Sequence, residues 1–465
     1  MKAFMINRSF LLLAISFTVT GFVSAAPSVI SFSPVAQSTT TSRNGEITIS
    51  FDGPMDVATL NASNIMIWGR WSGVASGSFQ IENNNSRVRF VPSTLFSAGE
   101  WVTVSISKAV KNQSGENLLK GYAWNFWIKT LPGTLNLTET SRITARRTAE
   151  GHVQSYGSHG ADLNKDGFSD MFVPNEISND CRVYLNNGTG GYSNFTVYPI
   201  PNGSRPSTNE SADFNHDGNI DIAVGNSTGD SITVFLGNGI GGFLSIKNYR
   251  ADNGIRGLSV ADLDGDGDAD IVTANRTGNN IALLLNDGSG NFTSRTVMES
   301  NGNAETACAI ADANNDGILD LFVGAYNSNE IILLLGNGSG GFTFSAKVAA
   351  GGSAPWKIAV GDVNGDGNVD VVSANANSNN CSVILGNGLG GLSTAVAYPT
   401  GVFPLSIVLG DIDGDGDLDL VTSNYSARNW NIYENNGSGV FINRRTLTAS
   451  LAGSCATLHD RDNDG

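Results

Sequence analysis

The sequence lacks the features of a zinc site, a small disulfide scaffold or a multi-span membrane protein. Its four cysteines, Cys181, Cys308, Cys381 and Cys455, lie about 70 to 130 residues apart, without the close spacings of metal sites or disulfide frameworks. We expect four small buried thiols within strands. After the first 25 residues, no stretch is apolar enough for a transmembrane helix.

Proline and charged residues are also scarce, whereas glycine is abundant. The 465 residues include 12 prolines and 56 glycines, and only 15% are charged. This composition is typical of short strands joined by many tight turns. We therefore predict an all-β protein of two domains.

Basic residues are fewer than acidic ones, with 27 Lys and Arg against 43 Asp and Glu. The formal net charge of −16 argues against nucleic acids and anionic membrane surfaces as partners, because like charges repel. Much of the acid is concentrated in short aspartate clusters between residues 162 and 464. This distribution indicates metal binding rather than a uniformly acidic surface.

Residues 1–25 have the pattern of a signal peptide. Lys2 and Arg8 precede an apolar run from Phe10 to Val23, and Val23-Ser24-Ala25 has the small-x-small pattern of a cleavage site. The run is about 14 residues long, short of the ~20 that a membrane span needs. We expect export to the extracellular space or the cell surface, with no transmembrane span.

Residues 27–130 contain no repeat and predict a small β-sandwich. The segments SFSP, ITISFDGPMDVATLNASNIMIWG, VRFVPSTLFSAGEWVTVSISKAV and NQSGENL resemble the bacterial Ig-like domain of surface-layer and other exported proteins. That resemblance implies a spacer or presenting module without catalytic residues. The expected strands are Glu46–Asp52, Ile65–Trp68, Arg87–Val91, Trp101–Ser107 and Ala123–Lys129.

A linker at 131–141 leads into a repeat of about fifty residues, which occupies residues 142–465. An aspartate motif begins at Asp162, Asp213, Asp262, Asp312, Asp362, Asp411 and Asp460, at intervals of 51, 49, 50, 50, 49 and 49 residues. Each unit predicts four short strands, A to D, with the aspartate motif between A and B. Such units predict a seven-bladed β-propeller whose last blade is incomplete in this chain. Arg142–Thr148 is the expected D strand that closes the ring.

The motif itself predicts a cation site. The complete copies are DLNKDGFSD, DFNHDGNID, DLDGDGDAD, DANNDGILD, DVNGDGNVD and DIDGDGDLD. Oxygen side chains recur at positions 1, 3, 5 and 9, with glycine at position 6, and Ca²⁺ prefers six to eight such hard ligands. An EF-hand needs a bidentate Glu at position 12, which is Val173 in the first loop and Thr273 in the third. Mg²⁺ is the weaker alternative because it keeps its waters.

Residues 150–465 resemble the FG-GAP or VCBS repeat family, the propeller type also found in integrin α-chains. The resemblance implies about six complete Ca²⁺ sites and a truncated seventh. Loops with Asn at position 3 are expected to bind Ca²⁺ more weakly than those starting at Asp262 and Asp411. Side chains at positions 1, 3, 5 and 9 and the carbonyl at position 7 are the implied ligands: Asp162, Asn164, Asp166, Phe168, Asp170; Asp213, Asn215, Asp217, Asn219, Asp221; Asp262, Asp264, Asp266, Asp268, Asp270; Asp312, Asn314, Asp316, Ile318, Asp320; Asp362, Asn364, Asp366, Asn368, Asp370; Asp411, Asp413, Asp415, Asp417, Asp419; Asp460, Asp462, Asp464.

No catalytic constellation stands out from the repeats. Three stretches satisfy G-x-G-x-x-G, but each lies between two expected strands rather than before a helix, which favours tight hairpins over a dinucleotide site. We therefore expect a non-enzymatic adhesion or ligand-binding protein for a glycan or a protein. A polysaccharide lyase and a structural component of a surface assembly are the alternatives.

Strand order places the aspartate loops and the C–D hairpins on one face of the propeller. The B–C loops and the connections between blades then lie on the other face, where polar and aromatic residues of successive repeats gather. Such side chains stack on sugars or anchor protein partners. The expected ligand-binding residues are Arg205, Arg256, Tyr326, Trp356, Phe403, Tyr425 and Trp430.

Overall fold

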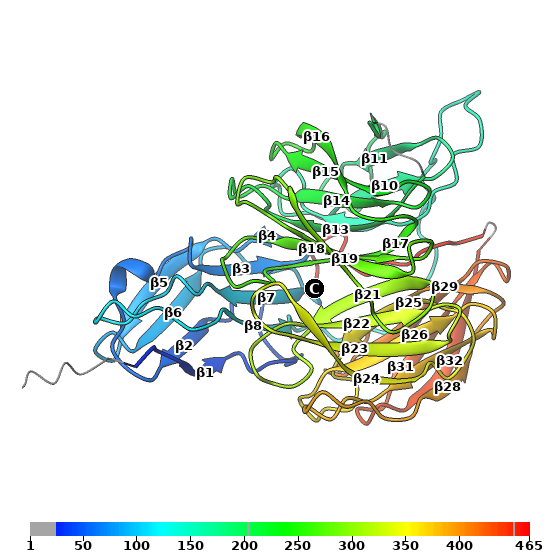
Figure 1. Ribbon diagram of the computed structural model, residues 1–465. Coiled ribbons are helices and arrows are strands. Elements are labelled where there is room, and N and C mark those ends of the chain that lie inside the picture. The colour runs from blue at the N-terminus through cyan, green and yellow to red at the C-terminus, as the bar shows by residue number, and fades with distance from the viewer. Residues whose placement is uncertain (1–24, 202–204, 450–451) are drawn as a thin grey trace, which may run out of the picture.

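The computed structural model describes residues 25–201, 205–449 and 452–465, and it is built from eight four-stranded antiparallel sheets (Figure 1). Two sheets form the N-terminal module, and six follow one another along the chain. The fold is all-β, with one short 3-10 helix, η1 (Val57–Thr59), in the described part of the chain. The predicted signal peptide lies outside the described residues except for Ala25.

The N-terminal module is a β-sandwich of two sheets, ordered β1-β2-β6-β5 and β4-β3-β7-β8. Alternate residues of β2 and β3 are buried, since each strand turns one side to the core and the other to solvent. Ile47, Ile49, Trp124 and Phe126 belong to that core. The strands are β1 (Val29–Ser33), β2 (Ile47–Phe51), β3 (Ile65–Gly69), β4 (Gly73–Val74), β5 (Gly77–Glu82), β6 (Arg87–Pro92), β7 (Trp101–Ile106) and β8 (Tyr122–Trp127).

Each of the six following sheets consists of four consecutive strands, A to D, as the repeat predicts. The B strands are buried on both sides because neighbouring blades cover both faces of each sheet. The blades are β9 (His159–Ala161), β10 (Asp170–Asn175), β11 (Asp180–Tyr184), β12 (Thr196–Pro199); β13 (Pro206–Ala212), β14 (Asp221–Asn226), β15 (Ser231–Gly237), β16 (Phe243–Arg250); β17 (Ile255–Ala261), β18 (Asp270–Asn275), β19 (Asn280–Leu285), β20 (Ser294–Met298); β21 (Glu305–Ala311), β22 (Asp320–Ala325), β23 (Glu330–Gly336), β24 (Phe342–Ala349); β25 (Pro355–Gly361), β26 (Asp370–Asn375), β27 (Asn380–Ile384), β28 (Val396–Pro399); β29 (Pro404–Gly410), β30 (Asp419–Asn424), β31 (Asn429–Asn435), β32 (Phe441–Thr448).

The A strands line the centre of the propeller, where β13, β17, β21, β25 and β29 neighbour one another in turn. Residues 452–465 lie between the first and sixth blades. Ala456 N donates to Ser406 Oγ in the sixth blade at 3.1 Å, and Ser454 Oγ donates to Ser155 O beside the first at 2.8 Å. This segment occupies the place of a seventh innermost strand, so the propeller has six full blades and an incomplete seventh.

The structure corrects the prediction that Arg142–Thr148 is a closing D strand. The segment is an exposed coil. The backbone oxygens of Thr144 and Ala145 accept hydrogen bonds from Tyr184 and Arg182 of the first blade. The predicted partner of this D strand is the C strand of the seventh blade, and the described residues contain no such strand, so the segment lies against the first blade instead.

The cysteine prediction is correct for three residues and wrong for the fourth. Cys181, Cys308 and Cys381 are buried in β11, β21 and β27, and all four thiols are free. Cys455 lies outside a strand and is half-buried, with its Sγ 3.4 Å from Ser158 Oγ.

Candidate metal centre and ligand-binding face

The aspartate loops wrap their own backbone with carboxylates. In every copy, the Oδ2 atom of the first aspartate accepts the N–H of the position-6 glycine at 2.6–3.1 Å. These glycines have positive φ, as Gly218 at 77° and Gly267 at 101° illustrate, which explains why glycine is used there. Position 4 also has positive φ, a feature that its frequent Gly and Asn residues signalled but that the motif analysis missed.

The aspartate at position 9 ties each loop to the hairpin between strands C and D. Its Oδ2 atom accepts the N–H of position 2 at 2.8–3.1 Å. Its Oδ1 atom accepts an N–H at the end of strand C at 2.6–3.0 Å. The aspartate loops and C–D hairpins therefore share one face, as expected. A carboxylate oxygen accepts more than one bond, so this residue can also contact a cation.

Acidic oxygens meet in three of the loops. Three groups each place one oxygen per residue within 4.8 Å of one another: Asp262, Asp264 and Asp270; Asp411, Asp413 and Asp419; Asp460, Asp462 and Asp464. Oxygens bound to one Ca²⁺ at 2.3–2.6 Å have separations of this size. These groups can hold a metal ion.

The electrostatics of the loops also fit a cation. Burial, and then the neighbouring carboxylates, raise the pKa of Asp262 to about 7. Burial raises the pKa of Asp221 and of Asp270 to about 8, despite the backbone N–H groups that each accepts. Buried and crowded carboxylates are costly when charged, and a divalent cation removes that cost.

In the loops with Asn at position 3, the Asn side chain donates a hydrogen bond to a neighbouring carboxylate and so stabilises part of its negative charge. Asn164, Asn215, Asn314 and Asn364 each donate from Nδ2 to the Oδ2 atom of the position-5 aspartate, at 2.9–3.2 Å. Neighbouring loops also touch. His216 Nε2 lies 2.6 Å from Asp268 Oδ1 of the next loop, a role that the sequence did not reveal.

The Ig-like module docks on the aspartate loops, and β3, β7 and β8 face the propeller (Figure 1). Lys108 N donates to Gly265 O at 2.8 Å, and Lys108 Nζ donates to Asp264 O at 2.9 Å. Ala123 N donates to Gly317 O of the fourth loop at 2.8 Å. A Cβ atom on Gly121 would lie 2.7 Å from the Cα atom of Gly265, so the contact requires glycine.

The opposite face carries a cluster of aromatic and arginine side chains, which we call the aromatic–arginine cluster: Tyr156, Arg256, Arg276, Tyr326 and Trp356. The Arg276 guanidinium lies 4.1 Å from the ring centre of Tyr326 and 5.1 Å from that of Trp356. The Arg256 guanidinium lies 5.3 Å from Tyr156 and 5.6 Å from Trp356. Each residue lies at or just before the start of an A strand or just after a B strand, and hence far from the aspartate loops.

The seven predicted ligand-binding residues do not form a single cluster. Arg256, Tyr326 and Trp356 belong to the cluster, and Phe403 packs beside it and contacts Tyr425, with ring centres 6.5 Å apart. Arg205 is exposed in a connection between blades. Trp430 instead packs against Leu135 and Val421 in a separate core.

Two members of the cluster were missed, although the repeat register contained them. Tyr156, Arg256 and Trp356 each lie six residues before the first aspartate of their repeat. Arg276, Tyr326 and Tyr425 each lie fourteen residues after it. Aligning the repeats on their aspartates therefore identifies Tyr156 and Arg276 as neighbours of the predicted residues.

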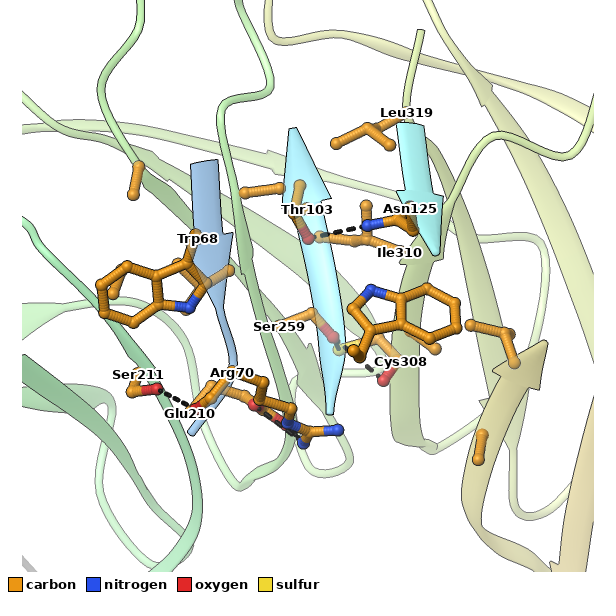
Figure 2. A pocket seen from close by; sticks show the side chains of 18 of the residues that line it. Trp68, Arg70, Thr103, Asn125, Glu210, Ser211, Ser259, Cys308, Ile310 and Leu319 are labelled. Carbon is orange, nitrogen blue, oxygen red and sulfur yellow. Dashed lines mark hydrogen bonds and ion pairs between the residues drawn. The ribbon is translucent and has the colours of Figure 1, made fainter. Parts of the chain in front are cut away.

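A cavity of about 220 Å³ lies at the centre of the propeller, beneath the Ig-like module. Figure 2 shows Trp68, Arg70, Thr103 and Asn125 of that module around it, together with residues of the A strands. Arg70 pairs with Glu210 at 2.7 Å, and Asn125 Nδ2 donates to Thr103 Oγ1 at 2.7 Å. None of the cavity residues on the Ig-like module was predicted as a site residue.

Comparison with family models identifies both parts of the chain. The bacterial Ig-like domain matches residues 23–127. The FG-GAP-like repeat matches six overlapping segments, 162–224, 213–273, 262–323, 312–373, 362–422 and 411–465. No curated protein matches the sequence significantly. Over the described residues, no helix has the length and apolar character to cross a membrane.

The solved structures that match this chain are remote in sequence. A lectin from Agrocybe aegerita that recognises non-reducing terminal N-acetylglucosamine is 18% identical, with a TM-score of 0.46 over 86% of this chain and 94% of its own. A Lactobacillus plantarum protein is 12% identical, with a TM-score of 0.48 over 84% and 98%. The PQQ-bound aldose sugar dehydrogenase of Streptomyces coelicolor is 15% identical, with a TM-score of 0.37 over 61% and 91%. Similarity this remote transfers no ligand or activity.

Proposed function

Because the chain belongs to the FG-GAP-like repeat family and carries a bacterial Ig-like domain before its repeats, we propose that it is an exported, calcium-stabilised, non-catalytic protein that binds a glycan or a protein. The proposal assigns recognition to the aromatic–arginine cluster and stability to the aspartate loops. Residues 1–25 would direct the export.

The stacking of Arg276 on Tyr326 and Trp356 carries the recognition part of this proposal. Such an arrangement offers flat apolar surface with N–H donors at its edge. Sugar rings bind to surfaces of this kind, and Trp, Tyr and Arg dominate the binding energy of many protein interfaces.

In the loops, the carboxylates of positions 1, 3, 5 and 9 and the carbonyl of position 7 would hold Ca²⁺. Calcium would supply the positive charge that the crowded carboxylates lack. Six ions would reduce the formal net charge from −16 to about −4. The three groups with converging acidic oxygens support this role most directly.

A glycan-array and pull-down screen in calcium, repeated with Trp356→Ala, tests the recognition site. We expect a ligand that the wild type binds and the variant loses, at an unchanged melting temperature. Phe344→Ala is the matched control, because Phe344 is a 44% exposed aromatic residue on the outer strand β24. Equal loss of binding in both variants would move the recognition site away from the cluster.

Two further observations distinguish a binding protein from the alternatives, a polysaccharide lyase and a structural component of a surface assembly. Growth of the ultraviolet absorbance of unsaturated uronates during incubation with acidic polysaccharides would favour a polysaccharide lyase. Assembly with other surface proteins, without binding of any soluble glycan, would favour a structural component.

A further inference from the structure

The cavity beneath the Ig-like module is lined by aromatic and small polar side chains, as ligand-binding cavities commonly are. Trp68, Trp101 and Trp127 line it from one side, and small polar residues of the A strands, such as Ser211 and Ser259, line it from the other. At ~30 Å³ per water, about 220 Å³ accommodates about seven waters or one monosaccharide-sized molecule.

Two buried polar atoms on this wall have no hydrogen-bond partner among the described residues. They are Asn125 Oδ1 and Trp127 Nε1, on side chains of residues that are 4% and 7% exposed. Buried polar atoms in proteins are nearly always satisfied, and the atoms that are not mark places where a ligand or water binds. Here one acceptor and one donor belong to residues that line the same cavity, which suits a molecule with hydroxyl groups.

Two cationic side chains, Arg70 and Lys357, and two carboxylates, Glu210 and Asp262, line the cavity. Arg70 pairs with Glu210, whereas Lys357 has no ion pair among the described residues. Burial lowers the pKa of the neighbouring His159 to about 4, so this imidazole is neutral. Asp262 also lines the cavity, but it belongs to the third aspartate loop. Lys357 interacts electrostatically with Glu210 but makes no ion pair with it, so its ammonium group can also pair with an anionic group of a ligand.

The cavity continues toward the aromatic–arginine cluster. A second cavity of about 130 Å³ shares Arg70, Trp101, Trp127, Glu210 and Lys357 with the first, and it reaches Tyr156, Arg256 and Trp356. Among the described residues, the buried Tyr156 hydroxyl makes no hydrogen bond of standard geometry, and the side chain of Trp356 in the cluster lies close to it. The cluster thus surrounds one end of a path that leads to Lys357.

We propose that this channel binds an acidic monosaccharide unit, a uronate, with its carboxylate at Lys357 and its hydroxyl groups at Asn125 Oδ1 and Trp127 Nε1. The inference rests on the proposed function, because the channel extends the glycan-binding face inward. It narrows the ligand from glycans in general to those with a terminal acidic sugar.

Calorimetric titration of the full chain in calcium with D-galacturonate, D-galactose and acetate tests this site. We expect binding of galacturonate at one site per chain, with galactose and acetate each at least about tenfold weaker, since each of them lacks either the charge-assisted hydrogen bond or the hydroxyl contacts. Lys357→Met should weaken galacturonate binding at least about tenfold, and Trp127→Phe, which keeps the ring but removes the donor, should weaken it less. Lys347→Met is the control, because Lys347 lies on the outer strand β24 and pairs with Glu330.

The results separate this inference from the function on which it rests. Equal affinity for galacturonate and galactose, no binding of either, or unchanged binding by a folded Lys357→Met variant would each overturn the uronate site. If Trp356→Ala abolishes binding of a longer glycan that Lys357→Met still binds, the surface function stands and the channel site is refuted. Thermal melts of each variant in calcium establish that it is folded.

Discussion

The substitution Asn364→Asp gives a direct test of the aspartate loops as cation sites. Asn364 occupies position 3 of the fifth loop, where its Nδ2 atom donates to Asp366 Oδ2 at 3.1 Å. The third and sixth loops have Asp264 and Asp413 at the same position. The variant therefore gives the fifth loop a carboxylate that other loops already contain.

The expected sign of the effect depends on calcium. Without it, the variant loses a hydrogen bond of about 0.5–1.5 kcal/mol and gains a like-charge contact of about 1 kcal/mol, so we expect a loss of roughly 1.5–2.5 kcal/mol in the free energy of unfolding. With calcium bound, the added carboxylate faces a divalent ion, and that attraction exceeds the repulsion between two single charges. We expect calcium to stabilise the variant by about 2–3 kcal/mol more than it stabilises the wild type, so that the deficit closes or reverses.

Urea denaturation in excess EGTA and in saturating calcium measures both free energies. Asn368→Asp is the matched control, because it adds the same charge at position 7, where the carbonyl rather than the side chain is the predicted ligand. Its additional stabilisation by calcium should be about 0–1 kcal/mol. If Asn364→Asp gains no more from calcium than Asn368→Asp does, position 3 is not a ligand and the assignment of the loops fails.

Three further changes test calcium binding, the first blade and the docked module. Chelation with EGTA should lower the melting temperature of the whole chain, since a site at a hundred times its Kd contributes about 2.7 kcal/mol, and an unchanged melting curve would contradict this. Arg182→Met should cost about 3–5 kcal/mol by urea denaturation, because it leaves the buried Asp180 without its cationic partner. The hydrogen bond from Arg182 lowers the pKa of Glu150 to about 2. The stabilisation from the Arg182–Glu150 pair is therefore present above the ordinary Glu pKa and should fade as pH falls toward 2 in the wild type, whereas the variant lacks this pair and should show no such loss. Lys108→Met should speed proteolysis of the 131–141 linker without lowering the melting temperature of the propeller, and an unchanged rate would show that this contact does not hold the module.

The repeat made most of the fold predictable. Each fifty-residue unit contains its own A to D strands, and the aspartate loop fixes where strand A ends and strand B begins. Six units thus became six sheets, because every contact within a blade is local in sequence. The Ig-like module was likewise predictable from its alternating strands, such as Ile47–Phe51.

Contacts between units were harder to predict. Arg142–Thr148 was predicted as a strand of the seventh blade, but a strand forms only beside a partner, and the described residues contain no C strand of that blade. Lys357 and Asn125 lie more than two hundred residues apart, and no periodicity connects them. Their shared cavity depends on how two domains dock, which a single sequence does not encode in a local pattern.

The docking of the Ig-like module links the aspartate loops to the central cavity. Two of its backbone hydrogen bonds go to the oxygens of Gly265 and Gly317, which belong to the third and fourth aspartate loops. The carboxylates of a loop and the cation they would hold determine where those oxygens point. A cation that orders the loops therefore favours docking, and docking favours the cation to the same extent. Since β3, β7 and β8 also close the central cavity, any ligand bound there would be coupled to the same equilibrium.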